Sequence, residues 1–166
     1  MSDLESLLSA IGAASKVPVR KRALTNHNVL NEAYSYAKPS SFSLGIAIDL
    51  GDLTILLISG TASIDEQGMS IHIGDLRPQT RRTFSNIAGL LASEGATWHD
   101  VVRTSCYLRD IERDYEAFNE ERTAFYTELG LDPLPASTGI QAILCRPELL
   151  VEIEAIAIFL RPPAGS

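Results

Sequence analysis

The chain has 166 residues, 45% hydrophobic and 21% charged, a balance typical of a globular protein with one domain and its own core. No hydrophobic run approaches the roughly 18–20 residues that a membrane-spanning helix needs, so no membrane partner is expected. The net charge of −7 disfavours binding to nucleic acid, which requires clustered Lys and Arg.

The cysteines and histidines do not indicate a metal site. The two cysteines, Cys106 and Cys145, are too few for a disulfide scaffold, and the sequence has neither a CxxC motif nor a Cys/His cluster. The three histidines are far apart in the sequence. We therefore expect no metal and no other cofactor.

Residues 1–40 are expected to form an N-terminal extension, residues 41–162 the main domain and residues 163–166 a short tail. The apolar spacing within Leu4–Ile11 predicts a short amphipathic helix. The acidic start of the chain does not resemble a signal peptide, which favours a cytoplasmic location. The basic cluster Lys16–Arg22 is interpreted as a solvated linker.

A β-hairpin is predicted at the start of the main domain. Phe42–Leu50 and Leu53–Ser59 are rich in residues that favour strands, and Gly51 and Asp52 separate them as a two-residue turn. A third, shorter strand is predicted within Met69–Ile73.

The first helix of the main domain is predicted to begin near Leu76. Asp75 can cap it, and Pro78 is tolerated only in a first turn. Gly95 provides the stop signal. The buried face of this helix is expected to consist of Thr80, Phe84, Ile87 and Leu91.

A strand, Val101–Leu108, and a second helix follow. Asp110 or Asp114 is expected to cap this helix, which runs through Leu129. Its apolar stripe is predicted to be Phe118, Phe125 and Leu129.

Two last strands, Ala136–Leu144 and Leu149–Leu160, complete the order β-β-(β)-α-β-α-β-β. This order predicts an α+β fold in which one mixed sheet carries both helices on a single face. Because the last strand is apolar on both sides, the other sheet face also needs cover. Oligomerisation through this open face would supply it and would place ligand sites in clefts between subunits.

Two carboxylates interrupt the last strand. Glu152 and Glu154 are two residues apart and share one face, about 7 Å from each other in an ideal strand. A nearby like charge raises the pKa of a carboxyl group, which suits an acid or base near neutral pH. Glu152 is therefore the leading catalytic candidate, and Glu154 either tunes it or pairs with an arginine. The structural alternative for Glu152 is an ion pair across a subunit boundary.

Four stretches together resemble the Rid family, also called YjgF-like or L-PSP: ISGTASIDEQG (58–68), residues 74–111, FNEERTAFY (118–126) and VEIEAIAIF (151–159). The resemblance implies a chorismate-mutase-like α+β fold and a homotrimer with active sites in the subunit clefts. It also implies hydrolysis of reactive enamines and imines, with release of ammonia and a 2-oxo acid. The family's older ribonuclease label fits poorly with the acidic charge.

The resemblance carries over to some site residues but not to all. Glu152 matches the water-activating carboxylate, Asn119 matches a pocket asparagine, and Ser59 and Gly60 preserve the backbone turn that lines the cleft. Ser137 stands where family members have an arginine that grips the substrate carboxylate. A serine cannot make the bidentate, charge-assisted grip of a guanidinium.

Other residues are therefore candidates for binding a carboxylated substrate. Arg146 precedes Pro147, so its backbone is expected to be extended, and it is the nearest available replacement for the missing arginine. Thr138 and Gln141, on the strand that normally carries this arginine, can donate and accept hydrogen bonds. Glu154 completes the set of expected binding residues.

A second resemblance is to the C-terminal half of chorismatases, carried by SGTASI (59–64), by the string His72, Gly74, Asp75, Gln79 and Thr80, and by CRPELLVEIE (145–154). In that family a glutamate of the last strand acts as acid/base, and some subtypes add a cysteine seven residues earlier, as Cys145 precedes Glu152. This makes Cys145 a second catalytic candidate, although a small buried hydrophobic role is the common one for cysteine.

The sequence thus favours a Rid-like homotrimeric enzyme of the deaminase or hydrolase type. A chorismatase-like hydrolase or lyase is one alternative. The other is a catalytically silent ligand-binding or interaction protein, which the loss of the family arginine at Ser137 motivates.

Overall fold

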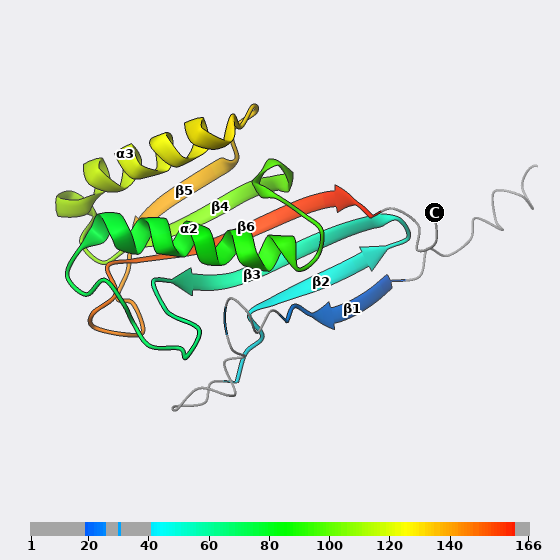
Figure 1. The fold of residues 1–166 in the computed structure, drawn as a ribbon, viewed down its shortest axis with the longest axis horizontal. Coiled ribbons are helices and arrows are strands. Elements are labelled where there is room, and N and C mark those ends of the chain that lie inside the picture. The colour runs from blue at the N-terminus through cyan, green and yellow to red at the C-terminus, as the bar shows by residue number, and fades with distance from the viewer. Residues whose placement is uncertain (1–18, 26–29, 31–40, 162–166) are drawn as a thin grey trace, which may run out of the picture.

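The computed structural model describes residues 19–25, 30 and 41–161, which form a six-stranded mixed sheet with two long helices on one face (Figure 1). The sheet has the strand order β1-β2-β3-β6-β4-β5, in which only β4 and β5 run parallel. The predicted α+β fold is confirmed. The helix expected at Leu4–Ile11 lies outside the described residues.

The strands are β1 (Val19–Ala23), β2 (Gly45–Leu50), β3 (Leu53–Ala62), β4 (Val101–Leu108), β5 (Ala136–Gln141) and β6 (Val151–Leu160). The predicted hairpin is β2–β3, whose turn contains Gly51 in the left-handed region with φ of 65°. The last two strands are each shorter than predicted, because the segment between them forms bends and turns.

The interpretation of Lys16–Arg22 as a solvated linker is wrong for its described part. Val19–Ala23 pairs antiparallel with β2 as the edge strand of the sheet, from Val19 opposite Leu50 to Ala23 opposite Ile46. Basic residues are common on exposed edge strands, where they discourage further pairing. Charge alone therefore did not distinguish a linker from an edge strand.

The two helices are α2 (Leu76–Ala92) and α3 (Ile111–Leu129), and a short 3-10 helix, η2 (Trp98–Asp100), precedes β4. Asp75 is the N-cap of α2 without a side-chain hydrogen bond, whereas the Asp110 side chain accepts a bond from the Arg113 backbone N–H. No helix in the described ranges is long and apolar enough to span a membrane.

The buried face of α2 is as predicted, with Thr80, Phe84, Ile87 and Leu91 all at 0% exposure. The stripe predicted for α3 is wrong at Leu129, which is 38% exposed in the last turn of the helix. Tyr126 is buried instead, because its ring packs against Phe84 and Trp98 with centroid separations of 6.0 and 5.8 Å.

The predicted strand at Met69–Ile73 is not formed. Its only β-type contact is an isolated bridge between Ser70 and Ile64. The Asp65 carboxylate accepts hydrogen bonds from the backbone N–H groups of Gln67 and Met69, and this turn bends the chain away from extended structure.

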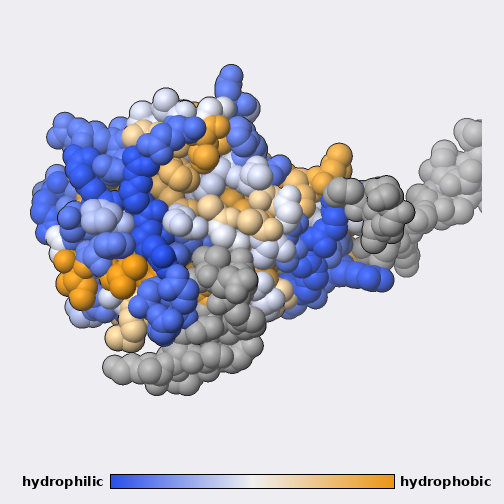
Figure 2. All heavy atoms as spheres, in the orientation of Figure 1, coloured by the Kyte–Doolittle hydropathy of each residue, from blue (hydrophilic) through white to orange (hydrophobic). Residues whose placement is uncertain are grey.

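The two sides of the sheet differ in cover. Val151, Ile153, Ala155 and Ala157 of β6 face the helices and are at most 1% exposed. Figure 2 shows the helix side of the molecule, where hydrophilic residues predominate and hydrophobic ones form small patches. The other side, here called the open face, carries a row of apolar residues across three strands: Ile46, Ile48, Leu50, Leu53, Ile55, Leu57, Ile156, Ile158 and Leu160.

Candidate active site

Glu152 lies on the open face of β6, opposite Ala62 of β3 and Tyr107 of β4. The pairing of β3 with β6 shifts between Ile58 and Thr61, which forms a β-bulge. This bulge brings Gly60 against the carboxylate. A side chain at Gly60 would overlap Glu152 Oε1 and lie 3.0 Å from its Cδ. The glycine therefore makes the space that the carboxylate occupies.

The environment of Glu152 favours its protonated form. Burial raises the pKa of this carboxyl group, and the negative charge of Glu154 raises it further. Among the described residues, none donates a hydrogen bond to Glu152 and no arginine forms an ion pair with it. A half-buried carboxylate of raised pKa accepts a proton more readily than an ordinary glutamate does.

Glu154 lies beside Glu152 on the same face and is held by Tyr107. The Tyr107 hydroxyl donates a 2.8 Å hydrogen bond to Glu154 Oε2. This bond, together with burial, raises the pKa of the phenol, so Tyr107 remains a donor at neutral pH. Glu154 also lines a pocket of about 290 Å³ on the open face, together with Ser59, Arg103 and Ser105.

Cys145 and Arg146 lie on the other side of the bulge. Both line a small hollow of about 60 Å³ that also includes Gly60. Partial burial and the charge of Glu152 raise the pKa of the exposed Cys145 thiol, which disfavours its thiolate form. The Arg146 guanidinium donates to the Gly68 carbonyl at 2.7 Å and to Ser70 Oγ at 3.2 Å.

Ser59 supports the bulge rather than pointing a free hydroxyl into it. Its Oγ donates a 2.8 Å hydrogen bond to the Ser43 carbonyl, and its backbone N–H donates to the Leu44 carbonyl at 3.0 Å. These two bonds fix the chain next to Gly60, which in turn fixes the space around Glu152.

The remaining predicted site residues lie around β5, two strands away from Glu152. Thr138 Oγ1 accepts a 3.0 Å hydrogen bond from Arg103, and Asn119 Oδ1 accepts one of 2.6 Å from Arg122. Gln141 Oε1 accepts a 3.2 Å bond from the Ile111 backbone N–H, at the first residue of α3. Gln141 thus satisfies an N-terminal helix donor.

The structure therefore divides the predicted residues into two groups. The first group contains Glu152, Glu154, Gly60, Ser59, Cys145 and Arg146, and the second contains Asn119 and Gln141. Thr138 lies between them on the open face, because Arg103, which lines the pocket beside Glu154, donates to it. Strands two apart in a sheet are separated by about 10 Å. One small ligand does not contact Glu152 and Asn119 of the same chain.

Sequence reasoning missed two residues that the structure connects to these groups. Tyr107 is opposite Glu152 in the pairing of β4 with β6, which follows only from the strand register. Arg122 lies three residues after Asn119 on α3, so helical spacing contained a signal for their contact.

A sequence model described as endoribonuclease L-PSP matches residues 40–159. A RutC family protein of Pyrococcus abyssi is 32% identical over 67% of this chain and 82% of its own length. The 3-aminoacrylate deaminase RutC of Acinetobacter baylyi is 33% identical over 62% of this chain and 78% of its own. The crystal structure of the YjgF gene product from E. coli superposes with a TM-score of 0.66 at 23% identity, covering 85% of this chain and 99% of that one, and shows the same fold.

Proposed function

Because the chain belongs to the endoribonuclease L-PSP family, whose members are also called Rid or YjgF-like proteins, we propose that it is a deaminase-type hydrolase of small carboxylated enamines or imines. The similarity to a 3-aminoacrylate deaminase supports this reaction class. The observation that carries the proposal is the half-buried Glu152 carboxyl group, which has no ion-pair partner among the described residues. The Gly60 bulge accommodates it, and its pKa is raised.

In the proposed reaction Glu152 moves one proton in each direction. Its carboxylate takes a proton from a water molecule while the water oxygen bonds to the carbon of the C=N group, whose nitrogen is protonated. The protonated Glu152 then returns the proton to the nitrogen, the C–N bond breaks as the C=O bond forms, and the hydroxyl proton goes to the departing ammonia, which leaves as ammonium. The raised pKa of Glu152 makes its carboxylate a stronger base for the first step.

The active site is proposed to lie between subunits of a homotrimer. Glu152 and the α3–β5 residues lie too far apart in one chain, so the Glu152 of one copy would meet the α3–β5 edge of the next. The exposed apolar residues of the open face support such an assembly: Leu57 is 40% exposed and Leu160 is 73% exposed. Sedimentation equilibrium should give three times the protomer mass.

The activity is tested by measuring ammonia release from 3-aminoacrylate and from the enamines of small amino acids. Glu152→Gln keeps the size of the side chain and removes the base, so kcat should fall about 10²–10⁴-fold. Glu116→Gln, an exposed position on α3, is the matched control and should keep full activity. Unchanged turnover in a Glu152→Gln trimer would refute the assignment.

The chorismatase-like alternative is supported by one observation, the position of Cys145 and Arg146 beside Gly60 in the same hollow. It requires pyruvate release from chorismate, with loss of activity in Cys145→Ala. Ammonia release from enamines without any action on chorismate would exclude it in favour of the deaminase. Tight ligand binding with no turnover of either substrate class would favour the silent scaffold.

A further inference from the structure

We propose that Arg122, together with Asn119 and Ser137, forms the receptor for the substrate carboxylate. This inference rests on the proposed function for the identity of the ligand as a substrate, but the receptor has its own geometry. All three residues lie where α3 covers the edge strand β5, on the helix side of the sheet.

The guanidinium of Arg122 is held in place by neutral partners. Its Nη2 donates a 2.6 Å hydrogen bond to Asn119 Oδ1, and its Nη1 donates a 3.0 Å bond to Ser137 Oγ. Its Cζ lies 5.2 Å from the ring centroid of Phe118, which is fully buried. These contacts fix the orientation of the guanidinium before any ligand arrives, which reduces the cost of binding.

The positive charge of Arg122 has no carboxylate partner within the described ranges. The ion pairs found there use six other arginines: Arg22, Arg77, Arg81, Arg82, Arg113 and Arg161. A guanidinium has five N–H donors, of which Arg122 uses two on Asn119 and Ser137. The remaining donors are sufficient for a bidentate bond to an anion.

Asn119 adds further donors beside the guanidinium, and Ser137 accepts one of its hydrogen bonds. The Oδ1 of Asn119 accepts from Arg122, so its amide N–H groups remain as donors. The Oγ of Ser137 accepts from Arg122 and, at 3.0 Å, from Thr104, and it also lies 3.7 Å from Cys106 Sγ, which is within reach of its proton. Guanidinium and amide thus form a set of donors with a single positive charge, and Ser137 helps to hold the guanidinium in place.

This donor set fits a carboxylate better than a phosphate. One guanidinium balances one negative charge and matches the two oxygens of a carboxylate in a plane. Phosphate carries close to two charges near neutral pH and is bound by clusters of cations or by helix N-termini. Neither accompanies Arg122, which lies in the second half of α3.

The receptor assigns to Ser137 a role that differs from that of an arginine at the same position. The serine does not supply a guanidinium, but it accepts a hydrogen bond from the guanidinium of Arg122. Arg146, the candidate from sequence, lies in the other group of residues, with its guanidinium on the Gly68 carbonyl. Substitution of Arg122 is therefore expected to weaken carboxylate binding more than substitution of Arg146 does.

The test is a binding titration of the whole protein with propanoate, with propanamide as its uncharged analogue and with inorganic phosphate. Arginine Nε–H resonances are followed by NMR, and Arg122→Gln assigns the one from Arg122. Wild type should bind propanoate saturably, shift that resonance, and bind propanamide and phosphate at least ten-fold more weakly. Arg122→Gln should weaken propanoate binding at least ten-fold, and Arg122→Lys should fall between the two.

Arg77→Gln is the matched control, because it removes one positive charge from the same helix pair at a residue that already has carboxylate partners. It should bind propanoate as wild type does. Ser137→Ala keeps the charge and should weaken binding only a few-fold. Wild-type affinity in Arg122→Gln, a larger loss in Arg146→Gln, a preference for phosphate, or no saturable binding by wild type would each overturn the proposal.

The same titration separates this inference from the proposed reaction. Propanoate contains no C=N group, so its binding does not require Glu152 as a base. Glu152→Gln should bind propanoate at least as tightly as wild type while it loses ammonia release. If Glu152→Gln retains turnover, the proposed reaction fails and the receptor stands. If Arg122→Gln binds normally, the receptor fails and the reaction stands.

Discussion

The Tyr107 hydroxyl donates a 2.8 Å hydrogen bond to Glu154, two residues along β6 from Glu152. This bond fixes a negative charge beside a carboxyl group whose pKa is already raised by burial. We predict that Glu154→Gln lowers the pKa of Glu152 towards its ordinary value. The limb of the kcat/KM–pH profile that reports Glu152 should therefore move to lower pH.

Tyr107→Phe is the matched comparison, because it removes the hydrogen bond and keeps the Glu154 charge. The limb of the kcat/KM–pH profile should move to lower pH by a smaller amount in Tyr107→Phe than in Glu154→Gln. A profile that is the same in Glu154→Gln and wild type would show that the charge of Glu154 does not act on Glu152.

The raised pKa of Glu152 also predicts how stability depends on pH. The folded state binds this proton more tightly than the unfolded state, whose pKa is near 4.5. The stability that this proton contributes is therefore complete below pH 4.5 and is lost as the pH rises through the folded pKa. Glutamine does not ionise, so Glu152→Gln should be more stable than wild type at pH 8.

Thermal unfolding at pH 4 and pH 8, at equal protomer concentration, measures this difference. The advantage of Glu152→Gln over wild type should shrink or vanish at pH 4. Glu116→Gln, which alters an exposed carboxylate, should show no comparable trend. An advantage that is larger at pH 4 would contradict the assigned direction of the shift.

Gly60→Ala is predicted to lower activity through Glu152 without unfolding the protein. The added Cβ would overlap Glu152 Oε1, and the flexible end of that side chain can move away. Displacement of a catalytic group by about 1 Å can cost on the order of 10²-fold in kcat. The measurement is kcat together with the melting temperature, which should change little.

A double variant shows whether Gly60→Ala acts through Glu152. If both substitutions remove the same proton transfer, adding Gly60→Ala to Glu152→Gln should lower kcat no further. Losses that multiply would mean that the bulge serves catalysis in another way.

The sequence predicted the periodic elements of this fold well, because their signals are local. Gly51 and Asp52 marked the β2–β3 turn, and Pro78 with Gly95 bounded α2 to within a few residues. The predictions were wrong where tertiary contacts decide which structure a segment adopts. Val19–Ala23 has the composition of a linker and becomes a strand only because β2 offers an edge to pair with.

The site was predictable in part for the same reason. Glu152 and Glu154 stand out in an apolar strand, so the residue pattern alone made them candidates. The contact of Gly60 with Glu152 depends on a bulge, and that of Tyr107 with Glu154 depends on strand register. Neither is encoded by spacing along the chain.

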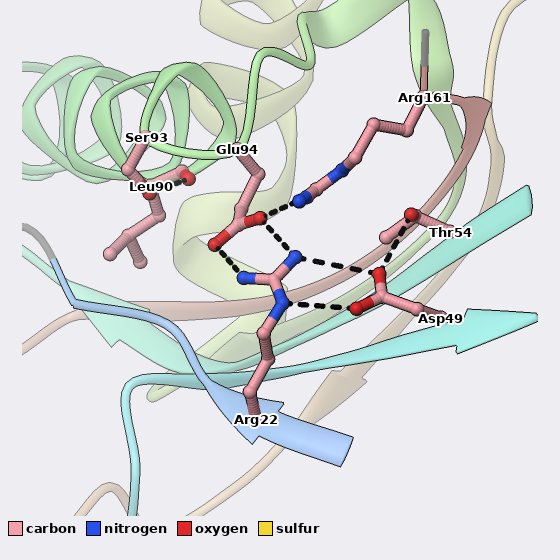
Figure 3. A network of polar contacts seen from close by, with 7 residues as sticks. All are labelled: Arg22, Asp49, Thr54, Leu90, Ser93, Glu94 and Arg161. Atoms are coloured by element: carbon pink, nitrogen blue, oxygen red, sulfur yellow. Dashed lines mark hydrogen bonds and ion pairs between the residues drawn. The ribbon is translucent and has the colours of Figure 1, made fainter. Parts of the chain in front are cut away.

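A network of charges ties the edge strand β1 to the rest of the domain (Figure 3). The Arg22 guanidinium lies between the carboxylates of Asp49 and Glu94, and Arg161 also donates to Glu94. Glu94 is largely buried, with 8% of its side chain exposed. Burial opposes its ionisation, but the bonds from Arg22 and Arg161 outweigh burial and lower the pKa of Glu94.

We predict that Glu94→Gln destabilises the protein by about 1–3 kcal/mol at pH 7, because two guanidinium groups lose their charged acceptor. The folded pKa of Glu94 is below its unfolded value near 4.5, so its contribution is present above that pH and is lost as the pH falls. Denaturant unfolding at pH 7 and pH 3 should therefore show a larger difference from wild type at pH 7 than at pH 3. Arg77→Gln, which breaks an exposed ion pair, should change stability little at either pH.

Hydrogen exchange should be faster at β1 in Glu94→Gln, because Arg22 anchors that strand through Glu94. Unchanged exchange at β1 would show that backbone pairing with β2 alone holds the strand.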